Sequence, residues 1–305
     1  MRTPWRAGAN LKAVTHRRSQ HVLLVAAATA VAAAIVGLFA LESPLGRDAD
    51  ARSLAGFEQV NGRLTGLANV VSHWTPVLVV ATGALLVAIS LFRGRRRVAL
   101  AVPLAMGAAV GTSELLKLLI AVPRFYAVLG PDQPGAGSWP SGHATAAMIT
   151  ALCAVLVVPA RLRPAVAVAG SIGVLTVSYS MLAIGSHYPS DILGGLLVAA
   201  MWMSLTLYAL WRREGDAVAV RVAPALADFR TAFVAAAVAA AGIAALAIAG
   251  AARPGVISVG GSLLVAAAAV AAVSATLTGG LVAALQSHRR LSLAPSRANA
   301  RPPAA

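Results

Sequence analysis

Three short groups of polar residues in this sequence have types and spacings suited to phosphate chemistry. The first group contains Lys117 and Arg124, which are seven residues apart, with Pro123 expected to end a helix between them. An ammonium and a guanidinium at this spacing can reach one anion, and the guanidinium binds phosphate oxygens in pairs. Local alternatives are that Lys117 pairs with Glu114 or extends toward lipid headgroups.

The second group is Pro-Ser-Gly-His, residues 140–143, which follows a loop rich in Pro and Gly and precedes the apolar run Ala144–Pro159. This pattern predicts the N-terminus of a helix. There Ser141, Gly142 and His143 would offer a hydroxyl, unpaired backbone N–H groups and an imidazole, and such N–H groups attract phosphate. By itself the tetrapeptide more often marks an ordinary helix start, because Ser and Gly are common caps.

The third group is His187 and Asp191, four residues apart around Pro189. At about one helical turn the carboxylate can hold one imidazole nitrogen, which makes the other nitrogen a nucleophile. His143 then remains as the proton donor to a leaving oxygen. Two histidines and an aspartate can also bind zinc, but the nearby cations would repel a metal ion, so we expect no metal and no cofactor.

The elements that position these groups are membrane helices by composition. The 305 residues are 59% hydrophobic and 11% charged, whereas soluble domains carry about 25% charged residues. The net charge of +15 comes mostly from arginines near the ends of apolar runs, so it does not indicate nucleic-acid binding. With Cys153 as the single cysteine, neither an internal disulfide nor a thiolate metal cluster is possible.

The sequence predicts an all-α, polytopic membrane protein with eight candidate spans. The first apolar run is about 20 residues long, longer than a signal-peptide core, so we interpret it as a retained span. Between the first two spans, apolar residues at helical spacing from Leu54 to Val71 predict an amphipathic helix on the membrane surface. The expected parts are a basic N-terminus (1–21), a six-span domain (22–211), two additional helices (231–286) and a disordered tail (287–305). The eight spans are Val22–Leu41, Pro76–Phe92, Val98–Val122, Ala144–Pro159, Pro164–Ile184, Ile192–Trp211, Thr231–Ala251 and Gly255–Leu285.

The basic residues predict the orientation of these spans. If the N-terminus is cytoplasmic, 19 of the 25 basic residues lie in cytoplasmic segments and 6 lie elsewhere. Cytoplasmic loops carry such an excess of Lys and Arg. We therefore expect both termini in the cytoplasm of a plasma-membrane protein. This orientation follows from the positions of Lys and Arg alone. It places the three polar groups at one depth on the extracytoplasmic side.

Taken together, the three groups resemble the signature motifs of the type 2 phosphatidic acid phosphatase family, which are membrane lipid phosphate phosphatases. The matching residues are Lys117-x6-Arg124, Pro140-Ser141-Gly142-His143 and Ser180-x6-His187-x3-Asp191. The resemblance implies a helical core and a phosphohistidine mechanism that needs no metal. His187 would be the nucleophile, Asp191 its orienting partner and His143 the general acid. Lys117, Arg124, Ser141 and Gly142 would bind the phosphate.

Two positions depart from the family pattern. Phe125 follows Arg124 where the family usually has Pro, and Met181 follows Ser180 where the family has Arg. The second change removes a phosphate-binding cation. We predict a phosphatase acting on a lipid phosphate or a polyprenyl mono- or diphosphate at the outer leaflet. The alternatives are a lipid phosphotransferase on the same scaffold and a non-catalytic phospholipid-binding protein. The sequence does not identify the oligomeric state.

Overall fold

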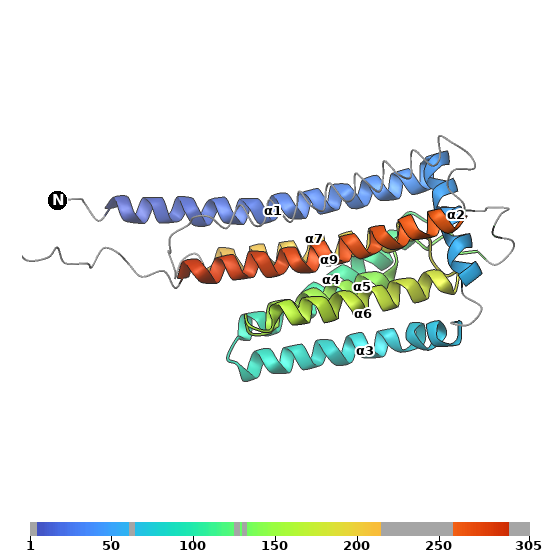
Figure 1. Cartoon of the computed structure of the whole chain (residues 1–305). Coiled ribbons are helices and arrows are strands. Elements are labelled where there is room, and N and C mark those ends of the chain that lie inside the picture. Colours follow the sequence, from blue (N-terminus) through green and yellow to red (C-terminus); the bar gives the residue numbers. More distant parts are fainter. Residues whose placement is uncertain (1–4, 61–64, 125–128, 130–132, 215–258, 293–305) are drawn as a thin grey trace, which may run out of the picture.

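The structure is a computed structural model, and it describes residues 5–60, 65–124, 129, 133–214 and 259–292. Over these residues the chain is helical and contains no strand, which confirms the predicted all-α class. The long helices run along a common direction and form a bundle (Figure 1). The helices are α1 (Trp5–Glu42), α2 (Pro44–Val60), α3 (Thr65–Phe92), α4 (Arg96–Leu119), α5 (Gly142–Val157), α6 (Arg163–Ala183), α7 (Pro189–Glu214) and α9 (Val259–Ser292).

Six of these helices are long and apolar enough to cross a membrane, namely α1, α3, α4, α6, α7 and α9. They coincide with six of the eight predicted spans. The predicted span Ala144–Pro159 corresponds to α5, which is apolar but has only 16 residues. The predicted span Thr231–Ala251 lies outside the described residues, as does most of the tail 287–305. The chain is therefore a multi-pass membrane protein.

The short helix α5 is the core of the bundle. It packs against α3, α4, α6, α7 and α9, and most of its residues are buried. At the C-terminal end of α5, the side chains of Arg93 and Arg95 donate hydrogen bonds to the carbonyl of Val157 over 2.7 and 3.0 Å. These two donors satisfy a carbonyl that the end of a helix leaves unpaired. Because protein surrounds it, α5 does not have to match the thickness of a bilayer.

The prediction of one amphipathic surface helix spanning Leu54 to Val71 is wrong. The stretch is divided between α2, which ends at Val60, and α3, which begins at Thr65. Leu54 on α2 is fully buried, whereas Leu67 on α3 is 64% exposed. Figure 1 shows α2 crossing the ends of the long helices. Its apolar face packs on α9, α6 and α7, so protein rather than lipid covers it.

The last described helix, α9, packs into the same bundle as the six-span region. It contacts α6 and α2 most extensively, and α5 and α7 as well. The hydroxyl of Tyr179 donates to the carbonyl of Ala267 over 2.8 Å, and the hydroxyl of Ser53 donates to the carbonyl of Ser262 over 3.2 Å. The second of these bonds joins α9 to α2. Hence α9 supports the crossing helix and is not merely appended to the bundle.

Candidate active site

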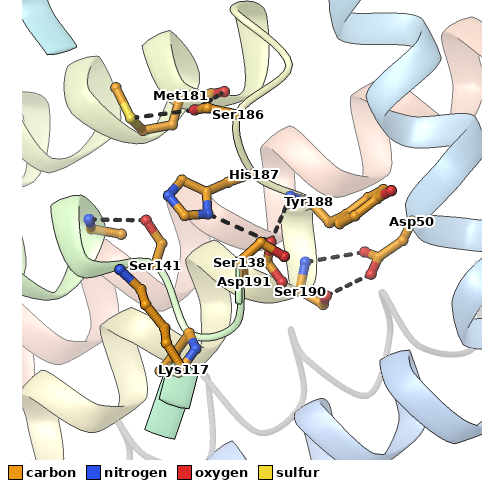
Figure 2. Close-up of polar contacts among 12 residues, drawn as sticks. Asp50, Lys117, Ser138, Ser141, Met181, Ser186, His187, Tyr188, Ser190 and Asp191 are labelled. Carbon is orange, nitrogen blue, oxygen red and sulfur yellow. Dashed lines mark hydrogen bonds and ion pairs between the residues drawn. The ribbon is translucent and has the colours of Figure 1, made fainter. Parts of the chain in front are cut away.

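The three polar groups predicted from the sequence meet at one end of the bundle, the end that the crossing helix α2 covers. Lys117 is in the last turn of α4, Ser141 caps α5, and His187 precedes α7. Figure 2 shows these side chains facing one another from separate elements. Three segments spread over more than 70 residues of sequence therefore build one site.

The N-termini of α5 and α7 touch directly, and this contact sets the geometry of the site. The backbone N–H of Ser141 donates to the carbonyl of Asp191 over 2.9 Å. A glycine at position 195 permits the approach, because a Cβ there would lie 2.6 Å from the carbonyl oxygen of Ser141 and 2.9 Å from the hydroxyl of Thr145. The histidine of each motif is thus held beside the same pair of helix N-termini.

A buried tryptophan in the loop before α5 joins the site to the first helix. Trp139 is 5% exposed. A Cβ at Gly37 on α1 would lie 2.6 Å from its ring, and a Cβ at Gly194 on α7 would lie 2.7 Å from its Nε1. The two glycines therefore provide the space in which the indole packs between α1 and α7.

His187 faces the carboxylate that the four-residue spacing predicts. Its Nδ1 lies 3.5 Å from Oδ2 of Asp191, at the long limit for a hydrogen bond (Figure 2). The same oxygen accepts a hydrogen bond of 2.9 Å from the backbone N–H of Tyr188, and Asp191 is fully buried. With Nδ1 directed at the carboxylate, Nε2 is the ring nitrogen left for chemistry.

Arg124 contacts two carboxylates on the side of the site that holds His187. Its Nη2 donates over 2.6 Å to Oδ1 of Asp191 and over 2.6 Å to the hydroxyl of Ser138. Its Nη1 lies 3.3 Å from Oδ2 of Asp50, and its guanidinium stacks 4.1 Å from the ring centre of Tyr188. The side chain is 2% exposed. In this arrangement the guanidinium fixes Asp191, the partner of His187.

Lys117 forms an ion pair with Glu114, which was one of the local alternatives that the sequence allowed for this lysine. Its Nζ lies 2.7 Å from Oε1 of Glu114, and the two side chains are 21% and 56% exposed. A Cβ at Gly142 would lie 2.5 Å from that carboxylate oxygen and 3.0 Å from Nζ. The missing side chain of Gly142 thus lets both groups approach the N-terminus of α5, where an anion is stabilised.

The remaining residues of the second motif adjoin this pair. The hydroxyl of Ser141 accepts a hydrogen bond of 3.4 Å from the backbone N–H of Ala144, so it caps α5 as an ordinary helix start would. His143 is partly buried, and the charges of His187 and Lys117 are near enough to act on its imidazole. The two histidines are therefore close enough to act on one substrate.

Met181, which stands where the family has Arg, is a buried residue near the C-terminal end of α6. Its side chain is 1% exposed. Its Sδ lies 3.6 Å from the hydroxyl of Ser186 (Figure 2) and 3.9 Å from that of Ser72. Two small hydroxyl side chains therefore line the volume in which a longer cation would have to fit.

Asp50 is a site residue that the sequence analysis missed. It reaches the site from α2, where its Oδ2 accepts a hydrogen bond of 2.5 Å from the hydroxyl of Ser190 and its Oδ1 accepts one of 3.1 Å from the backbone N–H of that residue. Burial, followed by the neighbouring charge of Asp191, raises the pKa of Asp50 to about 7, although Arg124 and Ser190 act in the opposite direction. Asp50 lies between the first two predicted spans and in none of the three motifs, so no sequence pattern marked it.

Within the described residues, no cluster of three or more His, Cys, Asp or Glu side chains is placed to hold a metal ion. The cations that face the site are those of Arg124 and Lys117. The arrangement combines a buried imidazole that faces a carboxylate, a second histidine and a helix N-terminus that can attract an anion.

Comparison with known families identifies the central part of the chain. A family model of the PAP2 superfamily matches residues 98–214. This range runs from the start of α4 to the end of α7 and includes all three motifs, which confirms the resemblance seen in the sequence. Comparisons with curated proteins and with solved structures give no match.

Proposed function

Because residues 98–214 match a family model of the PAP2 superfamily, we propose that this membrane protein is a lipid phosphatase that works through a phosphohistidine intermediate. Members of the superfamily are generally phosphatases, which supports phosphatase-type chemistry on a lipid phosphate. The substrate we propose is a lipid phosphate or a polyprenyl mono- or diphosphate. The observation that carries the proposal is the placement of His187 between the carboxylate of Asp191 and the N-terminus of α5.

In the first step, Nε2 of His187 attacks the phosphorus atom. The bond from phosphorus to the leaving oxygen breaks, and His143 gives that oxygen a proton. The positive charge that develops on the imidazole ring is stabilised by Asp191, which faces Nδ1. In the second step, water attacks the phosphohistidine, phosphate leaves, and His143 takes up the proton of the water.

The phosphate oxygens are proposed to bind at the N-terminus of α5, beside Lys117 and Gly142. Substrate phosphate would replace the carboxylate of Glu114 as the anion at this place, since the present pair is partly exposed and exchangeable. Ser141 would contribute through the helix start that it caps. Arg124, although the family resemblance assigns it to phosphate binding, supports the reaction here through Asp191.

A lipid substrate is supported by the position of the site at one end of a membrane bundle. All elements that build it, including the C-terminal end of α4 and the N-terminal ends of α5 and α7, lie at that end. The arginines at 93–97, 161, 163 and 212 lie near the other ends of these helices. By the positive-inside rule, the site would face the extracytoplasmic side of the plasma membrane, with both termini in the cytoplasm.

The orientation is tested separately with single cysteines and a membrane-impermeant thiol reagent in intact cells. We expect cysteines introduced at 133–138 to react and cysteines at 212–214 to stay unlabelled until the cells are opened. The reverse labelling would overturn the outer-leaflet proposal and leave the chemistry to be judged on its own.

The function is tested by assaying purified protein against a panel of lipid and polyprenyl phosphates, together with trapping of a labelled phosphohistidine. We expect phosphate release that survives chelators and is inhibited by vanadate. Acid-labile label on the peptide containing His187 should vanish in His187→Ala. Activity lost in a chelator and restored by a divalent ion would refute the histidine mechanism.

An added acceptor alcohol distinguishes the phosphotransferase, because phosphate would then appear on the alcohol. Binding of these lipids without turnover would identify the non-catalytic alternative.

A further inference from the structure

Asp50 belongs to a region that the family match does not cover, yet it contacts the centre of the site. It lies on α2, and the match begins at residue 98. Its carboxylate accepts two hydrogen bonds from Ser190, in the first turn of α7, and lies 3.3 Å from Nη1 of Arg124. Figure 2 shows Asp50 and His187 on opposite sides of this first turn.

Two short routes connect Asp50 to His187. The first passes through Arg124, whose other nitrogen donates to Asp191 over 2.6 Å. The second passes through Ser190, which is adjacent to Asp191 in the first turn of α7. Both routes end at the carboxylate that faces Nδ1 of His187. Asp50 does not touch the place where the phosphate would bind.

The charge of Asp50 matters because the surroundings are dry. The side chains of Asp50, Arg124 and Asp191 are 7%, 2% and 0% exposed. In the ionised state, two carboxylates share one guanidinium, so the group carries one excess negative charge. That excess favours the positive charge that develops on the imidazole when His187 becomes phosphorylated.

We propose that Asp50 is a positioning residue for His187, acting through Arg124 and Asp191 and adding a negative charge behind the nucleophile. This inference rests on the proposed phosphatase function. It assigns to α2, and through the bond between Ser53 and Ser262 to α9, a part in holding the site. The crossing helix thus completes a site whose motifs all lie elsewhere in the chain.

The pH dependence separates a charge effect from a structural one. With a pKa of about 7, Asp50 is mostly neutral at pH 5.5 and mostly ionised at pH 8.5. In the described part of the chain, the charged groups that act on it are Arg124 and Asp191. Asparagine has the shape of the neutral acid. Asp50→Asn should therefore match the wild type at low pH and differ from it at high pH.

The experiment compares kcat and KM of wild type, Asp50→Asn and Asp48→Asn between pH 5.5 and 8.5 on a lipid phosphate. Asp48 is the matched control, because it is an exposed acid on the same helix, paired with Arg52. We expect kcat of wild type and Asp50→Asn to agree within about twofold at pH 5.5 and to differ by about tenfold at pH 8.5. KM should stay unchanged, and Asp48→Asn should follow the wild type throughout.

A second readout needs no substrate. Diethyl pyrocarbonate acylates a neutral imidazole nitrogen, and mass spectrometry gives the rate at His187. We expect His187 of Asp50→Asn to be acylated more slowly than His187 of the wild type at pH 8.5. At pH 5.5 the two acylation rates should be equal. If no lipid phosphate is turned over but this pattern holds, the phosphatase proposal fails and the role of Asp50 stands.

If the ratio of the wild-type rate to the Asp50→Asn rate is the same at every pH in either readout, Asp50 is only structural and the inference is overturned. Unfolding midpoints in detergent establish that the variants are folded. If Asp50→Asn does not fold, Ser190→Ala replaces it. That variant removes the hydroxyl that stabilises the ionised carboxylate, so the rise of wild-type kcat with pH should move to higher pH. An unmoved profile would contradict the proposal.

Discussion

The two sides of the site differ in how their charges are held. On the nucleophile side, Arg124 and Asp191 form a pair that is almost wholly buried. On the phosphate side, Lys117 and Glu114 form a pair that is 21% and 56% exposed. Buried pairs are costly to break, whereas exposed pairs contribute little and exchange readily. The proposed nucleophile side is therefore held firmly in place, whereas the proposed phosphate side can release its anion for another.

The largest effect should come from the nucleophile itself. We expect His187→Ala to lower kcat by at least about a thousandfold, because the variant lacks the nitrogen proposed to form the covalent intermediate. The measurement is initial rate on a lipid phosphate, with the unfolding midpoint as a check of folding. His21→Ala on α1 is the control, since His21 is exposed. A variant that keeps a tenth of the wild-type rate would remove His187 from the mechanism.

The next prediction compares the two cations directly. Arg124→Gln should lower the free energy of unfolding by about 3–5 kcal/mol, because it leaves Asp50 and Asp191 buried without their partner. Lys117→Gln should change it by less than about 1 kcal/mol and mainly raise KM. Denaturation in detergent and steady-state kinetics measure the two quantities. Equal losses of stability would break the contrast between the two sides.

Much of the fold was predictable because composition and periodicity are local properties. Apolar runs near the length of a bilayer located α1, α3, α4, α6, α7 and α9, although α1 and α3 begin more than ten residues before the predicted spans. The course of α2 was not predictable in this way. Its apolar face looks the same in sequence whether lipid or α9 covers it, and only the tertiary structure decides.

The candidate site was predictable to the extent that its residues lie in short motifs. The four-residue spacing of His187 and Asp191 anticipated their contact, and the three-residue spacing of Glu114 and Lys117 left their pair open. Asp50 was missed because it is 74 residues from Arg124 in the chain and belongs to no motif. One of the two carboxylates that contact Arg124 also comes from this distant helix.

The position that lacks the family arginine offers a third test. We expect Met181→Arg to lower the unfolding midpoint, because Met181 is 1% exposed and its polar neighbours are the hydroxyls of Ser72 and Ser186. In the folded fraction, an added cation beside the histidines should raise kcat by about tenfold. Met181→Leu is the control for volume. A stable variant that is no faster would show that the missing cation does not limit turnover, which favours the transferase and binding alternatives.

The smallest effect is expected at the exposed pair. Glu114→Gln removes an anion that competes with substrate for Lys117 and the N-terminus of α5, so KM should fall by about threefold while kcat and stability hardly change. Asp48→Asn, which removes an exposed pair on α2 that is not among the site residues, should leave KM unchanged. An increase in KM would indicate that Glu114 orients Lys117 instead of competing for it.

The burial of α5 has a consequence for the way this protein diverges. Lipid accepts almost any apolar side chain, so exposed positions of α3 such as Leu78 and Val80 are free to drift among Leu, Ile, Val and Phe. Met148 and Leu152 on α5 are packed by neighbours and have no such freedom. Substitutions should therefore accumulate around the perimeter of the bundle, while its shortest helix changes only together with the side chains that surround it.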